Sequence, residues 1–186
     1  YNIYANPTAM MNIAHSPFPL SPGPTSLAGA QGAAITRTSI TRIGNEAPYT
    51  FNNLGWIPDG STITDGNAVQ AGLDRDGTDG IDPNSEAVGV NRNFNFAFDP
   101  FDPNTNTGDD PNPATQTYPG SGYQQGIITQ LFSICNWYHD ETYRFGFTES
   151  ARTFQNVHFT GHGTAGYRVR GECQYLSVHN NTHFTS

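Results

Sequence analysis

The clearest pattern of apolar and polar positions lies between residues 122 and 145 and predicts a long amphipathic helix. Apolar side chains recur there every three or four residues, the spacing that places them along one side of a helix. The ends agree with this assignment. Ser121 and Gln124 have the spacing of a capping box, and Gly146 suits the left-handed position that follows a helix.

One arc of this helix is expected to be buried, with Leu131, Phe132 and Tyr138 in the core. At 100° per residue, His139 lies at the edge of the arc. Asp140 and Arg144 lie opposite it at i,i+4, the spacing of a solvent-exposed ion pair. The arc consists of Ile127, Leu131, Ile134, Tyr138, Thr142 and Phe145.

The rest of the chain reads as short strands between long turns. The β-branched run at 35–43 and the segment 61–69 are each expected to form a strand. Prolines in residues 1–32 predict an extended start, and repeated Asp-Pro pairs in 99–120 predict a turn-rich loop. The fold class is therefore α+β, loop-rich, with short antiparallel strands and one long helix, and residues 1–186 form a single domain or subdomain.

The charged residues are unevenly distributed along the chain, and the acidic ones concentrate in one stretch. The net charge is −8 and there is no lysine, and nine of the 16 acidic residues fall within residues 74–110. No clustered positive face is offered to a phosphate backbone, so nucleic acid is not an expected partner. No apolar run approaches the roughly 18 residues of a membrane span, so no membrane partner is expected. The chain starts at Tyr1 without a Met, and we expect a processed chain or a piece of a longer precursor.

The acidic stretch opens with carboxylates at alternating positions in a glycine-bearing loop. Asp74, Asp76 and Asp79 could bring several oxygens to one hard cation, for which calcium is the natural candidate. The loop departs from the helical calcium-binding pattern, because its sixth residue is Asp79 rather than Gly and its twelfth is Ser85 rather than Glu. The alternative is a solvated acidic turn in which Asp side chains bond their own backbone.

Histidines and cysteines give weaker signals. The pairs His158/His162 and His179/His183 have a spacing that suits zinc only on a helix, and glycines around the first pair argue against one. No Glu follows either first His, so the metalloprotease motif is absent and ordinary loop histidines are the default reading. The two cysteines, Cys135 and Cys173, could pair or remain thiols.

A longer motif spans the predicted helix and the segment after it. Its residues are Gln130-Leu131-Phe132, Asn136-Trp137-Tyr138-His139-Asp140 and the run from Tyr143 to Asn156, preceded by Asn53-Leu54-Gly55-Trp56 and by Thr64 to Ala71. This arrangement resembles the fungalysin family of secreted zinc metallopeptidases, over nearly the whole chain. The resemblance implies a secreted, extracellular protein with the fold of the amino-terminal half of a thermolysin-like peptidase unit.

The resemblance also implies that the two halves of the peptidase unit have different roles. In the family, these segments precede the His-Glu-x-x-His helix and the later Glu that hold zinc, so no catalytic residue or zinc ligand is carried over onto this chain. The carboxyl-terminal half of the same precursor is the expected partner. Asn180 to Phe184 resembles the edge strand that pairs with peptide or protein substrate, which places substrate contacts at Asn181 and Thr182.

Two functions follow from the resemblance. The chain is either the amino-terminal part of a secreted zinc metalloendopeptidase, not catalytic by itself, or a noncatalytic extracellular structural or binding protein that keeps the fold. The last 30 residues depart from the family pattern, for example at Val157-His158 and Gly161-His162-Gly163. Either the divergence of a noncatalytic relative or errors in the sequence of this region would explain these departures.

Overall fold

The computed structural model of this chain describes residues 1–3, 38–44, 55–76, 78–96, 117–120 and 122–175. One long helix, two short helical turns and two pairs of strands make up its regular structure. In chain order these are β1 (Asn2–Ile3), β2 (Thr38–Ser39), β3 (Val69–Leu73), η2 (Val90–Arg92), α1 (Gly122–Arg144), η4 (Glu149–Ala151) and β4 (Val169–Cys173).

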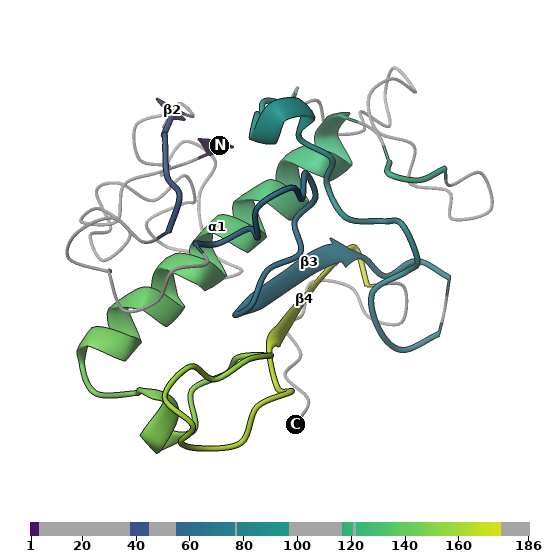
Figure 1. The fold of residues 1–186 in the computed structure, drawn as a ribbon. Helices are drawn as coiled ribbons and strands as arrows, with labels where there is room; N and C mark the ends of the chain where they lie inside the picture. Colours follow the sequence, from purple (N-terminus) through teal and green to yellow (C-terminus); the bar gives the residue numbers. More distant parts are fainter. Residues whose placement is uncertain (4–37, 45–54, 77, 97–116, 121, 176–186) are drawn as a thin grey trace, which may run out of the picture.

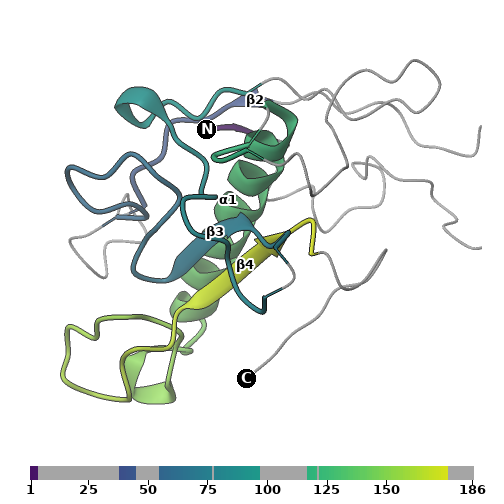
Figure 2. The same ribbon diagram turned by 90° about the vertical axis from the view of Figure 1, so that its right-hand side faces the viewer.

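The centre of the fold is a parallel pair of strands packed against the helix. β3 and β4 run side by side in parallel, with Val69 opposite Val169 and Leu73 opposite Cys173. Parallel neighbours need a long crossover connection, and here α1 lies within it. The helix packs along both strands, and the segment after it loops out beyond its end before returning as β4 (Figures 1 and 2).

The expectation of short antiparallel strands is correct only for the smaller pair. β1 and β2 are antiparallel, with Asn2 opposite Ser39. The strand expected at 35–43 is reduced to Thr38–Ser39, and residues 35–37 lie outside the described residues. The strand expected at 61–69 is wrong, because that segment forms turns and isolated bridges, and the regular strand begins only at Val69.

The long helix is confirmed almost to the residue. It runs from Gly122 to Arg144, and Gly146 follows it with a φ of +104°. A side chain at that φ would be strained, so a glycine there ends the helix at little cost. Ser121, the expected capping residue, lies outside the described residues.

The buried face of α1 is not the expected arc. Phe132 is fully buried as expected and Leu131 is half-buried, but Tyr138 is 64% exposed and Phe145 is 85% exposed. The observed buried face lies roughly 150° around the helix from the centre of the expected arc, counting 100° per residue. It consists of Gln124, Gly126, Ile128, Thr129, Phe132, Ser133, Asn136, His139 and Asp140.

Specific hydrogen bonds explain why a partly polar face is buried. Asp140 accepts a bond from the indole N–H of Trp56 at 2.8 Å, and the Gln124 amide donates to the side-chain oxygen of Gln174 at 2.8 Å. Buried polar groups are tolerated when they are bonded in this way. The expected surface pair of Asp140 with Arg144 is therefore wrong, since Arg144 pairs with Glu141 instead, at 3.1 Å.

The core fills the space between the helix and the parallel strands. Val69, Ala71 and Leu73 of β3 are fully buried against Ile128 and Phe132 of α1. Trp56, Phe94 and Cys173 belong to the same cluster. The helix in this part of the chain is not long and apolar enough to cross a membrane.

Candidate metal centre

The candidate site lies where β3 ends beside β4. Asp74 directly follows β3, and its backbone N–H donates to the carbonyl of Cys173 at 3.0 Å, which extends the ladder by one residue. The side chain is fully buried at this junction. Asp74 is thus placed by strand pairing rather than by the loop that it opens.

Close packing holds the following segment against the strand. A Cβ at Gly72 would lie 2.4 Å from Cγ2 of Ile81 and 2.6 Å from Oγ of Ser85, so only glycine allows this approach. The Ser85 hydroxyl accepts from the N–H of Leu73 at 2.9 Å and donates to its carbonyl at 3.1 Å. The loop between Asp74 and Ser85 therefore returns to the strand it left.

Asp82 organises the interior of this loop. Its carboxylate accepts backbone N–H bonds from Arg75 at 2.7 Å and from Asp76 at 3.3 Å, and also the hydroxyl of Tyr118. Asp76 in turn accepts from the N–H of Thr78 at 2.7 Å. The oxygens of both acids bond the backbone of their own loop, as the acidic-turn interpretation expects. Only Asp76 is solvated, because Asp82 is buried.

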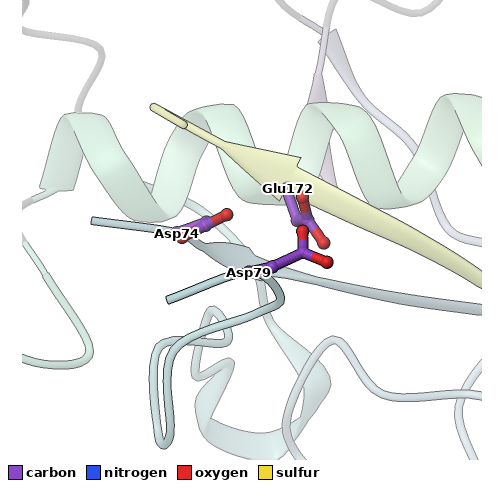
Figure 3. Close-up of side chains that lie close together, drawn as sticks. All are labelled: Asp74, Asp79 and Glu172. Atoms are coloured by element: carbon purple, nitrogen blue, oxygen red, sulfur yellow. The ribbon is translucent and has the colours of Figure 1, made fainter. Parts of the chain in front are cut away.

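Three other carboxylates converge from separate elements. Asp74 comes from the end of β3, Asp79 from the loop, and Glu172 from β4, where it lies opposite Gly72 (Figure 3). A ligand oxygen of each lies within 4.8 Å of those of the other two, and Asp74, Asp76 and Asp82 form a second such group. The expected Asp74, Asp76 and Asp79 thus do not form one group: Asp79 joins Asp74 in the first group and Asp76 joins it in the second.

Sequence reasoning missed Glu172 as a member of the site. It lies 98 residues beyond Asp74, and only the parallel register of β3 and β4 brings the two side chains together. Asp82 stands inside the acidic motif but was not singled out from its neighbours. The alternating Asp spacing was the one available signal, and it pointed to the loop rather than to the strand beside it.

Burial and like charges make the site unfavourable for a bare carboxylate. Burial, followed by the negative charges of Glu172 and Asp82, raises the pKa of Asp74 to about 6. The nearby backbone N–H of Gly80 opposes this rise without making a well-formed hydrogen bond. Burial and the bond to Asp82 likewise raise the pKa of Tyr118 above its usual value.

Within the described residues, both candidate groups offer only carboxylate oxygens. Hard cations such as calcium prefer this donor set, whereas protein zinc sites are built mainly from histidine and cysteine. Both ring nitrogens of His158 face backbone oxygens rather than a second histidine: Nδ1 lies 2.6 Å from the oxygen of His162 and Nε2 lies 3.3 Å from that of Thr153. The described residues therefore do not fit zinc. His179, His183, Asn181 and Thr182 lie outside them.

Comparison with known proteins places the chain in a class. The family model described as Fungalysin metallopeptidase (M36) matches residues 30–186. The chain therefore belongs to the fungalysin metallopeptidases, as the sequence resemblance indicated.

Its curated relatives are fungal. The chain is 29% identical over 157 residues to "Extracellular metalloproteinase MEP" of Pyricularia oryzae, covering 83% of this chain and 21% of that protein. It is 34% identical over 126 residues to "Extracellular metalloproteinase MEP" of Fusarium vanettenii, covering 65% and 17%. It is 33% identical over 143 residues to "Extracellular metalloproteinase 1" of Arthroderma gypseum, covering 75% and 20%. The chain thus spans about a fifth of the length of these relatives.

Proposed function

We propose that this chain is the amino-terminal part of the peptidase unit of a secreted zinc metalloendopeptidase, and that it supports the catalytic half rather than supplying catalytic residues. Family membership over residues 30–186 is the observation that carries this proposal. The 186 residues contain two His-x-x-x-His pairs, and neither has the Glu that would take a proton from a zinc-bound water. The zinc ligands are thus assigned to sequence beyond this chain.

The outer side of α1 supports this assignment. Tyr138 and Phe145 are exposed there, and Tyr167 is exposed in the loop that precedes β4. Large apolar side chains on several neighbouring segments are what an interaction surface leaves uncovered. We assign this surface to the downstream half of the same peptidase unit. Tyr138 and Phe145 of the expected apolar arc then belong to an interface, whereas Ile127 and Leu131 of the same arc pack against the core of this part.

Substrate contact is proposed at Asn181 and Thr182. The support is the resemblance of Asn180 to Phe184 to the family's edge strand, which would hold an extended peptide through backbone hydrogen bonds. Because backbone groups make these bonds, the side chains can differ from the family pattern without loss of binding. The substrate class is therefore an extended peptide or protein segment.

The test compares the 186-residue chain with the complete open reading frame that contains it. Both proteins are purified and incubated with casein, with and without a zinc chelator, and their zinc content is measured by elemental analysis. We expect chelator-sensitive cleavage and one zinc per molecule only for the longer protein. Cleavage by the chain alone would contradict the proposal. A reading frame with no downstream His-Glu-x-x-His would favour the noncatalytic extracellular module instead.

A further inference from the structure

Asp74 is a buried carboxylate without a well-formed hydrogen bond to offset its charge. It is fully buried, and neither of its oxygens has a hydrogen-bond partner within the described residues. A carboxylate in that state is costly, and buried polar groups without partners are rare in native proteins. Its oxygens share a small volume with carboxylates from two other elements. A group of this kind indicates a ligand of opposite charge.

We propose that Asp74, Asp79 and Glu172 bind one calcium ion, which ties the end of β3 to β4 and to the loop that follows β3. Calcium lies 2.3–2.6 Å from its oxygen ligands, so two ligand oxygens on the same ion are separated by at most about 5 Å. The observed limit of 4.8 Å among the three side chains meets this requirement. Water can complete the coordination, because Asp79 is exposed.

The second group of carboxylates is a weaker candidate. Asp82 already accepts bonds from two backbone N–H groups and from Tyr118, and Asp76 accepts from Thr78. Those contacts are sufficient to explain why these two acids stand where they do. A solvated turn does not explain Glu172, which belongs to β4, nor the bare carboxylate of Asp74. The first group therefore carries the site.

Calcium suits this group better than magnesium. Magnesium demands near-ideal octahedral geometry and gives up its water reluctantly, whereas calcium accepts irregular sets of carboxylates. Here the ligands come from a strand end, a strand and an exposed loop, which is an irregular set. The ion would neutralise Asp74 and hold the 74–82 loop against the sheet.

Direct binding is the first test. The purified chain is treated with EDTA, dialysed, and titrated with calcium chloride by isothermal calorimetry, beside Asp74→Asn, Glu172→Gln and the control Asp59→Asn. Asp59 is an exposed acid that pairs with Arg92 and belongs to neither group. We expect one site in the parent and the control, and at least tenfold weaker binding in the two site variants. Absence of saturable binding to the parent, or parental affinity in Glu172→Gln, would overturn the proposal.

Thermal melting gives a second test, in which the Tm difference between Asp74→Asn and the parent should change sign when calcium is added. Without calcium, Asp74→Asn should melt above the parent, because it removes a buried charge. Calcium at a hundredfold excess over the parent's Kd should raise the parent's Tm by about 5–10 °C and that of Asp74→Asn by at most about half as much, so that the order reverses. A further comparison uses only the parent chain, whose melting curves are recorded in calcium, magnesium and sodium at matched ionic strength. Identical curves in all three would show screening of an acidic loop and would refute the site.

Discussion

Trp56 donates its indole N–H to the carboxylate of Asp140 across 2.8 Å, and both residues are buried. The two stand 84 positions apart, and the bond fastens the segment before β3 to the helix. Nδ1 of His139 lies 3.1 Å from the other oxygen of the same carboxylate. Asp140 is thus a buried acid satisfied from two sides, and this arrangement fixes the rotation of α1 about its own axis.

Removal of the indole donor should destabilise the fold. Trp56→Phe keeps an aromatic ring in the core but deprives the buried Asp140 carboxylate of a hydrogen bond. Leaving such a group short of a partner costs about 1–3 kcal/mol, and more when it is charged. Urea unfolding followed by circular dichroism measures the change. Asp59→Asn is the surface control, and an unchanged midpoint for Trp56→Phe would mean that water replaces the donor.

Two substitutions on opposite sides of α1 should separate core from interface. Phe132→Ala should cost about 3–5 kcal/mol in the isolated chain, as expected for a large buried aromatic. Tyr138→Ser should change its stability by less than about 0.5 kcal/mol, since the side chain is exposed.

In the complete peptidase, Tyr138→Ser should instead lower the yield of active enzyme, because the same side chain would face the downstream half. Denaturation midpoints of the chain and casein activity of the longer protein provide the two readouts. Loss of stability for Tyr138→Ser in the isolated chain would place the residue in the core after all.

Glu149 should contribute to acid sensitivity. Burial favours its neutral form, but hydrogen bonds from the Thr160 hydroxyl and from the N–H groups of Phe159 and Thr160 outweigh burial and lower its pKa. A lowered folded-state pKa gives stability that is present above the usual value of 4.5 and is lost as the pH falls through the folded value.

Glu149→Gln should therefore destabilise the chain by about 1–3 kcal/mol at pH 7 and by progressively less toward pH 3, where the parent is also neutral. Unfolding curves at several pH values measure this. Glu141→Gln is the control: Glu141 is partly exposed and pairs with Arg144 on the helix surface, so little effect is expected. A constant difference between Glu149→Gln and the parent over this range would show that the charge is not what stabilises the loop.

The two cysteines are thiols in this structure, and both should react slowly in the folded chain. Burial raises the pKa of Cys135 to about 11, and burial together with the neighbouring Cys135 raises that of Cys173 to about 12. Because the thiolate is the reactive form, a thiol reagent at pH 8 should label neither quickly. In guanidinium, which unfolds the chain, the same reagent should then react with two thiols per molecule. If neither thiol reacts after denaturation, Cys135 and Cys173 form a disulfide in the purified protein.

The residues of the helix and those next to it predicted the bounds of α1 well, but they did not predict which face of α1 is buried. Gly146 ends the helix where its sequence position predicts, since this effect acts within one turn, whereas the expected cap at Ser121 lies outside the described residues. The rotation of the helix depends on Trp56 and Gln174, which are distant in sequence, and no periodicity encodes them. The same applies to the site. Alternating acids located Asp74 and its loop, whereas Glu172 joins them only through strand pairing.

The parallel pairing of β3 with β4 also has a consequence for synthesis. When β3 and α1 leave the ribosome, the strand that lies beside β3 has not yet been made, and the partner of Val69 follows 100 residues later. Contacts at such separation form slowly, because the intervening chain must first be ordered. Until Cys173 emerges, the apolar residues of β3 have the helix on one side and an open edge on the other. A nascent chain paused in this interval would expose that edge to other chains, which makes it the stage at which a chaperone is most useful.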